Sequence, residues 1–226
     1  MLSDHVIFCD GEAIILDKPA GLAVDPPRNG GLSLENYLAS LTFGFQRWPV
    51  AVHRLDRDTS GCLLLARNPK AHKRFAAAFE ARQVVKGYIA VIEGIPDEAS
   101  GMIDLPLFKV SSAEEGWRMV VDERGKSART AWEKLAEKDG RSMIRFFPET
   151  GRTHQIRAHA LYGLGAPIVG DPVYGTGSPK AGSMLLHSHF LSLTREGKPP
   201  VEATAPLPER FTTAGFGPEY LTGGDV

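Results

Sequence analysis

The chain of 226 residues contains only two cysteines, Cys9 and Cys62, which stand far apart in separate apolar runs. So few thiols exclude a disulfide framework and a zinc site built on cysteine pairs. No apolar stretch approaches the roughly 20 residues that a membrane-spanning helix needs. The first dozen residues carry acids and lack the long apolar segment of a secretion signal. We therefore expect a reduced, cytoplasmic protein without a membrane partner.

The chain also lacks an excess of charge, because 26 Lys and Arg stand against 27 Asp and Glu. This balance argues against a polyanion binder whose whole surface is basic. The distribution is uneven, however, since residues 51–90 and 141–160 together carry a net charge of +8 and the rest of the chain carries −9. If the fold brings these two segments together, they form a positive groove. A solvated charged surface is the alternative interpretation.

Short apolar runs of strand length are separated by turns marked by Gly and Pro. Residues 71–82 and 153–161 have the apolar spacing of amphipathic helices. The helices do not alternate with strands as βαβ units require, so the pattern predicts an α+β protein with a largely antiparallel mixed sheet and flanking helices. The expected strands cover residues 13–16, 62–66, 84–92, 143–147 and 185–193.

One acid stands between two arginines in the sequence HRLDRDTSG, which leads into an expected strand. Asp56 follows Arg54 by two residues and precedes Arg57. The end of a rigid element is a useful place for a reactive group, and nearby guanidinium groups favour the ionised carboxyl. A turn with local ion pairs, capped by Asp58 or Ser60, explains the same pattern without catalysis.

Two further segments place cations near groups that can move protons or bind anions. In the expected strand VVKGYIAVI, alternation puts Lys86 and Tyr88 on the same face. In the sequence GRTHQIR, His154 and Arg157 share a helix face and Arg152 precedes the first turn. This arrangement indicates binding of a phosphate or a carboxylate. A core tyrosine and an exposed amphipathic helix are the simpler interpretations.

Taken together, these motifs resemble the RluA-type RNA pseudouridine synthases. HRLDRDTSG matches the catalytic motif H-R-L-D-x-x-T-S-G of that family, and KGY and GRTHQIR resemble its K-x-Y and G-R-x-H-Q-[IL]-R motifs in the same order. Weaker similarities at LDKPAG, GKSART, GDPVYG and LLHS extend the resemblance over most of the chain. It implies the pseudouridine synthase fold with a central active-site cleft. We expect one catalytic domain at residues 1–211 and a loosely ordered tail at residues 212–226, which are rich in Gly and Thr.

The resemblance implies an isomerase that converts specific uridines in tRNA or rRNA to pseudouridine, with base flipping and without a cofactor. In this family the glycosidic bond from N1 breaks, the uracil turns, and C5 joins C1′. The matched positions imply Asp56 as the essential carboxylate, Arg152 as its partner, and Tyr88 as the residue that packs on the uracil. Tyr88 is also the nearest candidate to move a proton. Whether Asp56 attacks the ribose or the base, or promotes loss of a ribose proton, stays open.

The resemblance also implies a set of RNA contacts. Arg54 is placed to fill the space that the flipped base leaves. Leu186 is an expected wall of the uracil pocket, although a core leucine is the simpler interpretation. The expected partner is an RNA stem-loop. We expect no N-terminal S4 module, so the catalytic domain alone recognises this RNA. No obligate protein partner is evident. The expected phosphate contacts are Arg57, Lys86, His154 and Arg157.

Two other functions fit parts of the sequence. The first is a metal-dependent hydrolase, which the absence of an H-E-x-x-H motif disfavours, and we expect no metal site. The second is an RNA-binding module that kept the fold and lost the reaction, against which the intact Asp56, Tyr88 and Arg152 argue. The candidate metal ligands are His53, His154, His159, His187 and His189 with Asp56.

Overall fold

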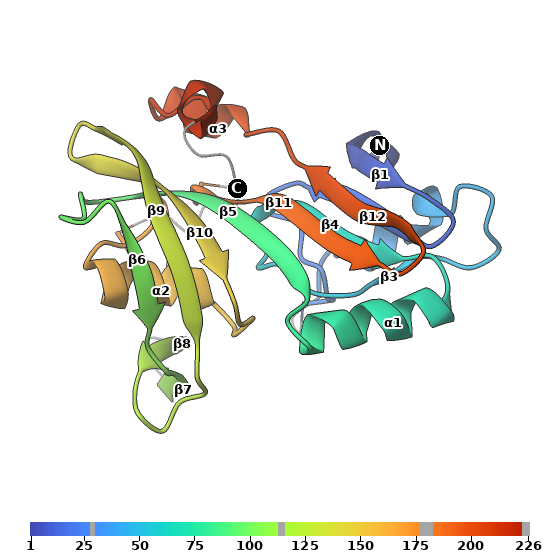
Figure 1. Cartoon of the computed structure of the whole chain (residues 1–226), viewed down its shortest axis with the longest axis horizontal. Coiled ribbons are helices and arrows are strands. Elements are labelled where there is room, and N and C mark those ends of the chain that lie inside the picture. Colours follow the sequence, from blue (N-terminus) through green and yellow to red (C-terminus); the bar gives the residue numbers. More distant parts are fainter. Residues whose placement is uncertain (28–29, 113–115, 177–182, 223–226) are drawn as a thin grey trace. The chain divides into compact units, whose positions relative to one another are not determined.

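The fold is α+β, with a largely antiparallel mixed sheet and a few helices, as the sequence predicts (Figure 1). The chain forms two compact units, which we call the first and the second unit. The first consists of Met1–Lys86 and Ser188–Pro206, and the second of Gly87–His187 and Leu207–Val226. The computed structural model describes residues 1–27, 30–112, 116–176 and 183–222.

In the first unit the strands follow the order β1-β2-β4-β11, with β12 on β11 and β3 on β4. The β1–β2, β2–β4, β3–β4 and β11–β12 pairs are antiparallel. The register pairs Lys18 with Gly61, so the end of β2 lies beside the start of β4. The elements are η1 (Leu2–His5), β1 (Val6–Cys9), β2 (Ala13–Lys18), η2 (Leu34–Leu41), β3 (Val50–Ala51), β4 (Ser60–Ala66), α1 (Pro69–Glu80), β11 (Leu186–Arg195) and β12 (Lys198–Thr204).

All seven residues of β4 are buried, which explains its continuous apolar sequence. Helix α1 lies beside the strands of this unit (Figure 1). It packs in the same hydrophobic cluster as β4, and Phe75 of α1 is fully buried. The helix begins two residues earlier than the sequence predicts, because the Asn68 side chain accepts a hydrogen bond from the Ala71 N–H at 2.9 Å and Pro69 suits the first turn. It ends at Glu80, before Arg82 takes a left-handed backbone with φ 58°.

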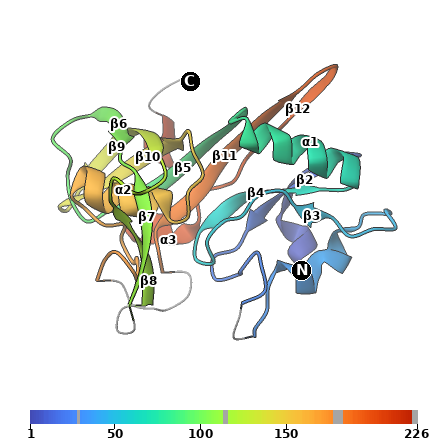
Figure 2. The same ribbon diagram turned by 90° about the horizontal axis from the view of Figure 1, so that it is seen from below.

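In the second unit the strands follow the order β5-β10-β9-β6, and each neighbouring pair is antiparallel (Figure 2). A separate two-stranded sheet is formed by β7 and β8. The chain passes between the two units within β5 and again within β11. The elements are β5 (Val84–Ile92), β6 (Ser100–Asp104), β7 (Leu107–Ser112), β8 (Gly116–Val121), β9 (Arg129–Lys138), β10 (Arg141–Pro148), α2 (Gln155–Leu164), α3 (Glu209–Thr213) and η3 (Pro218–Thr222).

The two faces of β5 pack in different clusters of the second unit. Tyr88 and Ala90 point to the cluster that contains α2, whereas Ile89 and Val91 point to the cluster that contains α3. The alternation expected for this strand is therefore confirmed. The second cluster also takes in Phe216, 1% exposed, so part of the segment predicted as a tail is core. Residues 223–226 of that predicted tail lie outside the described residues.

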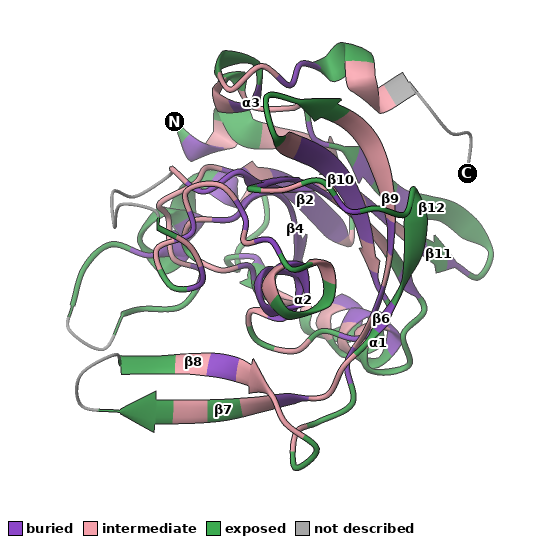
Figure 3. Ribbon diagram, turned by 90° about the vertical axis from the view of Figure 1, so that its left-hand side faces the viewer, coloured by how far each residue is buried: buried purple, intermediate pink, exposed green. Residues whose placement is uncertain are grey.

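The β7–β8 hairpin presents most of its surface to solvent. Figure 3 shows its strands largely in the colours of exposed and intermediate residues. Its apolar anchors are Leu107, 2% exposed, and Met119, 7% exposed, which pack with Tyr174. The hairpin is thus held at one end and along one face.

Candidate functional site

Asp56 lies in a tight turn directly before β4. The Thr59 N–H donates to the Asp56 carbonyl at 3.1 Å, and the Asp56 residue is half-buried. The neighbouring Arg57 donates through Nε and Nη2 to the two carboxylate oxygens of Asp58, at 3.2 and 3.1 Å. The local ion pair that the sequence allowed is therefore present, but it joins Arg57 to Asp58. The turn leaves Asp56 at the end of a buried strand, as expected.

A fully buried lysine anchors this turn. The Lys18 ammonium donates to the carbonyls of Arg57, Leu22 and Pro19 at 3.0, 2.8 and 3.0 Å. The Gly21 N–H donates to the same Arg57 carbonyl at 2.9 Å. The main chain next to Asp56 is therefore fixed by a buried positive charge. Sequence reasoning noted the LDKPAG motif and assigned no role to its lysine, so Lys18 is a positioning residue that it missed.

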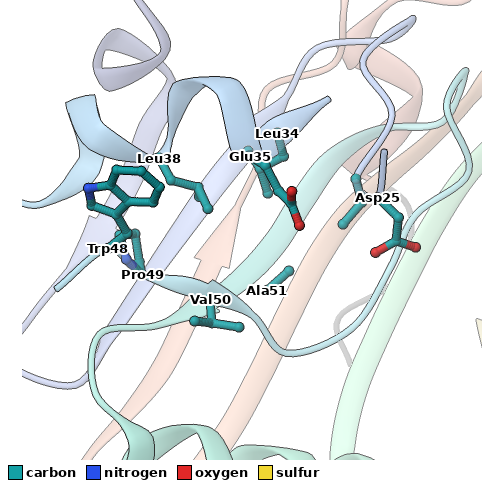
Figure 4. Close-up of a pocket in the computed structure, with 9 residues that line it drawn as sticks. Asp25, Leu34, Glu35, Leu38, Trp48, Pro49, Val50 and Ala51 are labelled. Carbon is teal, nitrogen blue, oxygen red and sulfur yellow. The ribbon is translucent and has the colours of Figure 1, made fainter. Parts of the chain in front are cut away.

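Arg54 is exposed and forms an ion pair with Asp25, with Nη1 and Oδ2 2.9 Å apart. Asp25 also lines a pocket of about 410 Å³. Figure 4 shows Trp48 and Leu38 at one end of this pocket and Asp25 at the other. Asp56 is not among the described lining residues, which are Val24, Asp25, Leu34, Glu35, Leu38, Trp48, Pro49, Val50 and Ala51.

Lys86 and His53 are two further polar residues of the motifs in the first unit. Burial lowers the pKa of Lys86. Burial, with a smaller effect of the Lys86 charge, lowers the pKa of His53 to about 3. The neutral His53 ring stacks on Phe79 at 4.6 Å and accepts the Leu64 N–H through Nε2 at 3.0 Å. His53 therefore supports β4 as a hydrogen-bond acceptor, which requires its proton on Nδ1.

In the second unit the segment before α2 is held by a buried glutamine. The Gln155 Oε1 accepts from the Arg152 N–H at 2.9 Å and from the Thr150 hydroxyl at 2.7 Å. Its Nε2 donates to the Thr130 hydroxyl oxygen at 2.9 Å. The Arg152 Nε donates to the Ser127 carbonyl at 3.0 Å. Gln155 is a second positioning residue that sequence reasoning left without a role, although its motif was recognised.

Arg157 is buried, at 5% exposed, and forms a two-pronged ion pair. Its Nε and Nη2 donate to the Asp171 carboxylate oxygens at 2.7 and 2.8 Å. Burial alone would raise the pKa of Asp171, but the hydrogen bonds and charge of Arg157 lower it. Separating such a buried pair is costly. Arg157 therefore has a structural partner inside the protein, and its expected phosphate contact stays a prediction.

The remaining predicted residues of the second unit lie in two places. Tyr88, half-buried, packs in the same hydrophobic cluster as Leu186, which is 3% exposed. The cluster is consistent with an apolar wall and also with ordinary core packing. His154 precedes α2 with a left-handed φ of 52°, and its ring stacks on Trp117 at 4.6 Å. Each unit by itself therefore carries part of the predicted site.

Four of the five histidines considered as metal ligands lie within hydrogen-bonding distance of other polar groups; these four are His53, His154, His159 and His189. The His159 ring contacts the Thr130 hydroxyl at 2.9 Å and the Leu105 carbonyl at 3.1 Å. The His189 Nδ1 lies 2.8 Å from the Ala205 carbonyl. Within the described ranges, no three His, Cys, Asp or Glu side chains are grouped to hold a metal ion. In the same ranges, no helix has the length and apolar character needed to cross a membrane.

Comparisons with known proteins agree with these motifs. Residues 12–162 match the family described as RNA pseudouridylate synthase. An uncharacterised RNA pseudouridine synthase of Zymomonas mobilis is 59% identical over 96% of this chain and 99% of its own length. Ribosomal large subunit pseudouridine synthase C of Rickettsia felis is 36% identical over 93% of this chain and 70% of its own length.

The fold is shared with a solved structure. Human RNA Pseudouridylate Synthase Domain Containing 4 superposes with a TM-score of 0.77 at 24% identity, over 93% of this chain and 91% of that one. The fold, the family match and the sequence relatives therefore agree with the resemblance that HRLDRDTSG, KGY and GRTHQIR carry. The chain belongs to the RNA pseudouridylate synthase family, as an isomerase of the RluA type.

Proposed function

We propose that this isomerase converts specific uridines of an rRNA or tRNA stem-loop to pseudouridine through Asp56. The observation that carries the proposal is the turn at Asp56, whose main chain is anchored by the buried Lys18 ammonium. A catalytic carboxylate needs a fixed position at the end of a rigid element. The name of the Rickettsia felis relative, which refers to the large ribosomal subunit, supports rRNA over tRNA.

Asp56 has the properties that the reaction requires of its essential acid. It is half-buried, so a substrate can approach it while part of its hydration is removed. A covalent intermediate on a carboxylate divides the exchange of the N1–C1′ bond for a C5–C1′ bond into two easier steps. The proton that leaves C5 is balanced by a proton gained at N1. Tyr88 and Arg152 of the second unit are the further proposed catalytic groups, with Leu186 in the uracil pocket beside Tyr88.

Base flipping is the proposed route by which a uridine in a stem reaches Asp56, because the reacting atoms are shielded in a stacked helix. Arg54 suits a role in this step. Its side chain is 72% exposed, and an ion pair between exposed groups such as Arg54 and Asp25 contributes little. Breaking the Arg54–Asp25 ion pair so that Arg54 can bind RNA therefore costs little free energy. Arg57, Lys86 and His154 are the remaining proposed RNA contacts.

The test is to incubate the purified protein with tRNA and large-subunit rRNA transcripts and to map pseudouridines by carbodiimide-induced reverse-transcription stops. We expect new stops with the wild type and with Asp58→Asn, and none with Asp56→Asn. Asp58 is the matched control because it lies in the same turn and its carboxylate contacts Arg57. Pseudouridine formed by Asp56→Asn would disprove the role of Asp56. RNA bound but never modified by the wild type would favour a non-catalytic module.

A further inference from the structure

The β7–β8 hairpin carries an exposed tryptophan that is held by its neighbours. Trp117 on β8 is 42% exposed. It is not loosely placed, because the His154 ring stacks on it with ring centroids 4.6 Å apart and an angle of 27° between the planes. The Lys109 ammonium of β7 lies 4.7 Å from the centre of the Trp117 ring. An indole, an imidazole and an ammonium thus form one surface of the second unit.

A buried tyrosine joins the parts of this surface. The Tyr174 hydroxyl accepts the Met119 N–H of β8 at 2.9 Å and lies 3.1 Å from the His154 Nδ1. Burial raises the pKa of Tyr174 to about 12, so its hydroxyl keeps its proton near neutral pH. One hydroxyl therefore fixes both the strand that carries Trp117 and the ring that stacks on it.

The ion pair of Arg157 holds that tyrosine in turn. The Asp171 carboxylate that binds Arg157 also accepts the Tyr174 N–H at 3.1 Å. The Arg157 guanidinium lies 5.3 Å from the centre of the Tyr174 ring. The GRTHQIR and GDPVYG motifs are therefore linked through side chains to the hairpin. The surface is preorganised, although it consists of an exposed strand pair and a helix terminus.

The geometry points to a nucleotide-binding platform made of Lys109, Trp117 and His154, which stacks an unpaired base of the RNA substrate and neutralises its phosphate. We call it the Trp117 platform; its assignment rests on the proposed function. Aromatic rings beside cations are the usual means of holding unstacked RNA bases. Stacking on an indole tolerates any base, so the platform adds affinity more than sequence selection.

Intrinsic fluorescence tests the platform directly, because a base stacked on an indole quenches it. The chain has three tryptophans, of which Trp132 is buried and Trp48 is exposed in the first unit. We expect single-stranded poly(U) to quench the wild type and Trp48→Phe, and to leave Trp117→Phe nearly unquenched. Equal quenching of all three proteins would overturn the platform. This readout depends on contact with RNA and does not change with a purely structural role.

Affinity gives the second measurement. In the Asp56→Asn background, which separates binding from turnover, we expect Trp117→Ala to weaken poly(U) binding about tenfold. Trp117→Phe should restore most of this loss, and Trp48→Ala should stay within twofold of the parent. The thermal midpoint of each variant shows whether it is folded. If Trp117→Phe and Trp117→Ala both bind as the parent does, the platform is wrong, whereas activity of Asp56→Asn would reject only the proposed function.

Discussion

The two motif-bearing segments are held in different ways. In the first unit, the turn at Asp56 is anchored through its main chain, because the Lys18 ammonium binds backbone carbonyls. In the second unit, the segment before and within α2 is anchored through side chains, by Gln155 and by the Arg157–Asp171 pair. Where the anchor binds the main chain, as at Asp56, the anchoring bonds do not involve the side chains of the HRLDRDTSG motif. Side-chain anchoring uses the motif's own side chains, so a motif residue such as Arg157 becomes part of the framework.

The largest effect predicted from this contrast is on activity alone. Asp56→Asn should lower the rate of pseudouridine formation by at least about 10³-fold, as loss of an essential catalytic group does. Because Asn has nearly the size of Asp and leaves the bonds of Lys18 to the backbone carbonyls in place, the thermal midpoint should change little. Single-turnover assays and calorimetry measure the two quantities. A large fall in the midpoint would show that Asp56 is part of the framework, as Arg157 is.

Asp171→Ala should have the largest effect on stability. It leaves the buried Arg157 guanidinium without its carboxylate, which typically costs about 3–5 kcal/mol. It also removes the acceptor of the Tyr174 N–H, so the hairpin should loosen. Urea unfolding gives the free energy, and hydrogen exchange of the Met119 amide reports on the hairpin. An unchanged unfolding free energy would mean that the side-chain anchor of the second unit is not required.

Lys18→Met should lower the free energy of unfolding by about 2–3 kcal/mol, because hydrogen bonds from a buried charge to three carbonyls are lost. Among folded molecules we expect a lower kcat with little change in KM, since the turn at Asp56 loosens. Lys198→Met is the control, because its ammonium is half exposed and pairs with Glu12, away from the turn at Asp56 in the sequence. If the two variants behave alike, the main-chain anchor is not important.

The last prediction concerns acid stability. The pKa of His53 in the folded protein is about 3, below the 6.5 of an unperturbed histidine. Between these values the unfolded chain binds a proton that the folded one does not, so stability falls as the pH falls through this window. His53→Gln keeps an acceptor for the Leu64 N–H and should lose less stability between pH 7 and pH 4. Urea unfolding at several pH values measures this.

The same experiment can compare the two units. Burial also lowers the pKa of His159 in the second unit. His159→Gln should therefore also lose less stability than the wild type as the pH falls. A larger loss of stability with falling pH in His53→Gln would contradict the neutral state assigned to this ring.

Much of the fold was predictable because it depends on local pattern. The apolar runs gave β2, β4, β5, β10 and β11, and the helical spacing gave α1 and α2. The order of the strands was not predictable, because it depends on pairings between distant segments. The hairpin was missed as well, since the exposed Trp117 and its neighbours have no periodic signal.

In the candidate site, too, local features were predictable and contacts between distant segments were not. The turn at Asp56 was predicted from an acid that precedes a buried strand, and the structure has it there. The burial of Arg157 was not predictable, because helical spacing places it beside His154 without showing that Asp171 approaches the same face. Lys18 was missed for a related reason. A lysine at a strand end is normally read as solvated, and only tertiary structure brings three carbonyls to it.

The passage of the chain between the units within β5 and β11 has a consequence for synthesis. The first unit takes Ser188–Pro206 from late in the chain, roughly a hundred residues after Lys86. About 120 residues separate the end of β4 from the start of β11, its neighbour in the sheet, so at a translation rate of about 5–20 residues per second β4 waits about 6–24 s for β11. During this time the edge of the apolar strand β4 that later pairs with β11 is open in the nascent chain, and such an edge can pair with other nascent chains. The newborn protein should therefore depend on chaperones that shield this edge until the last strands emerge.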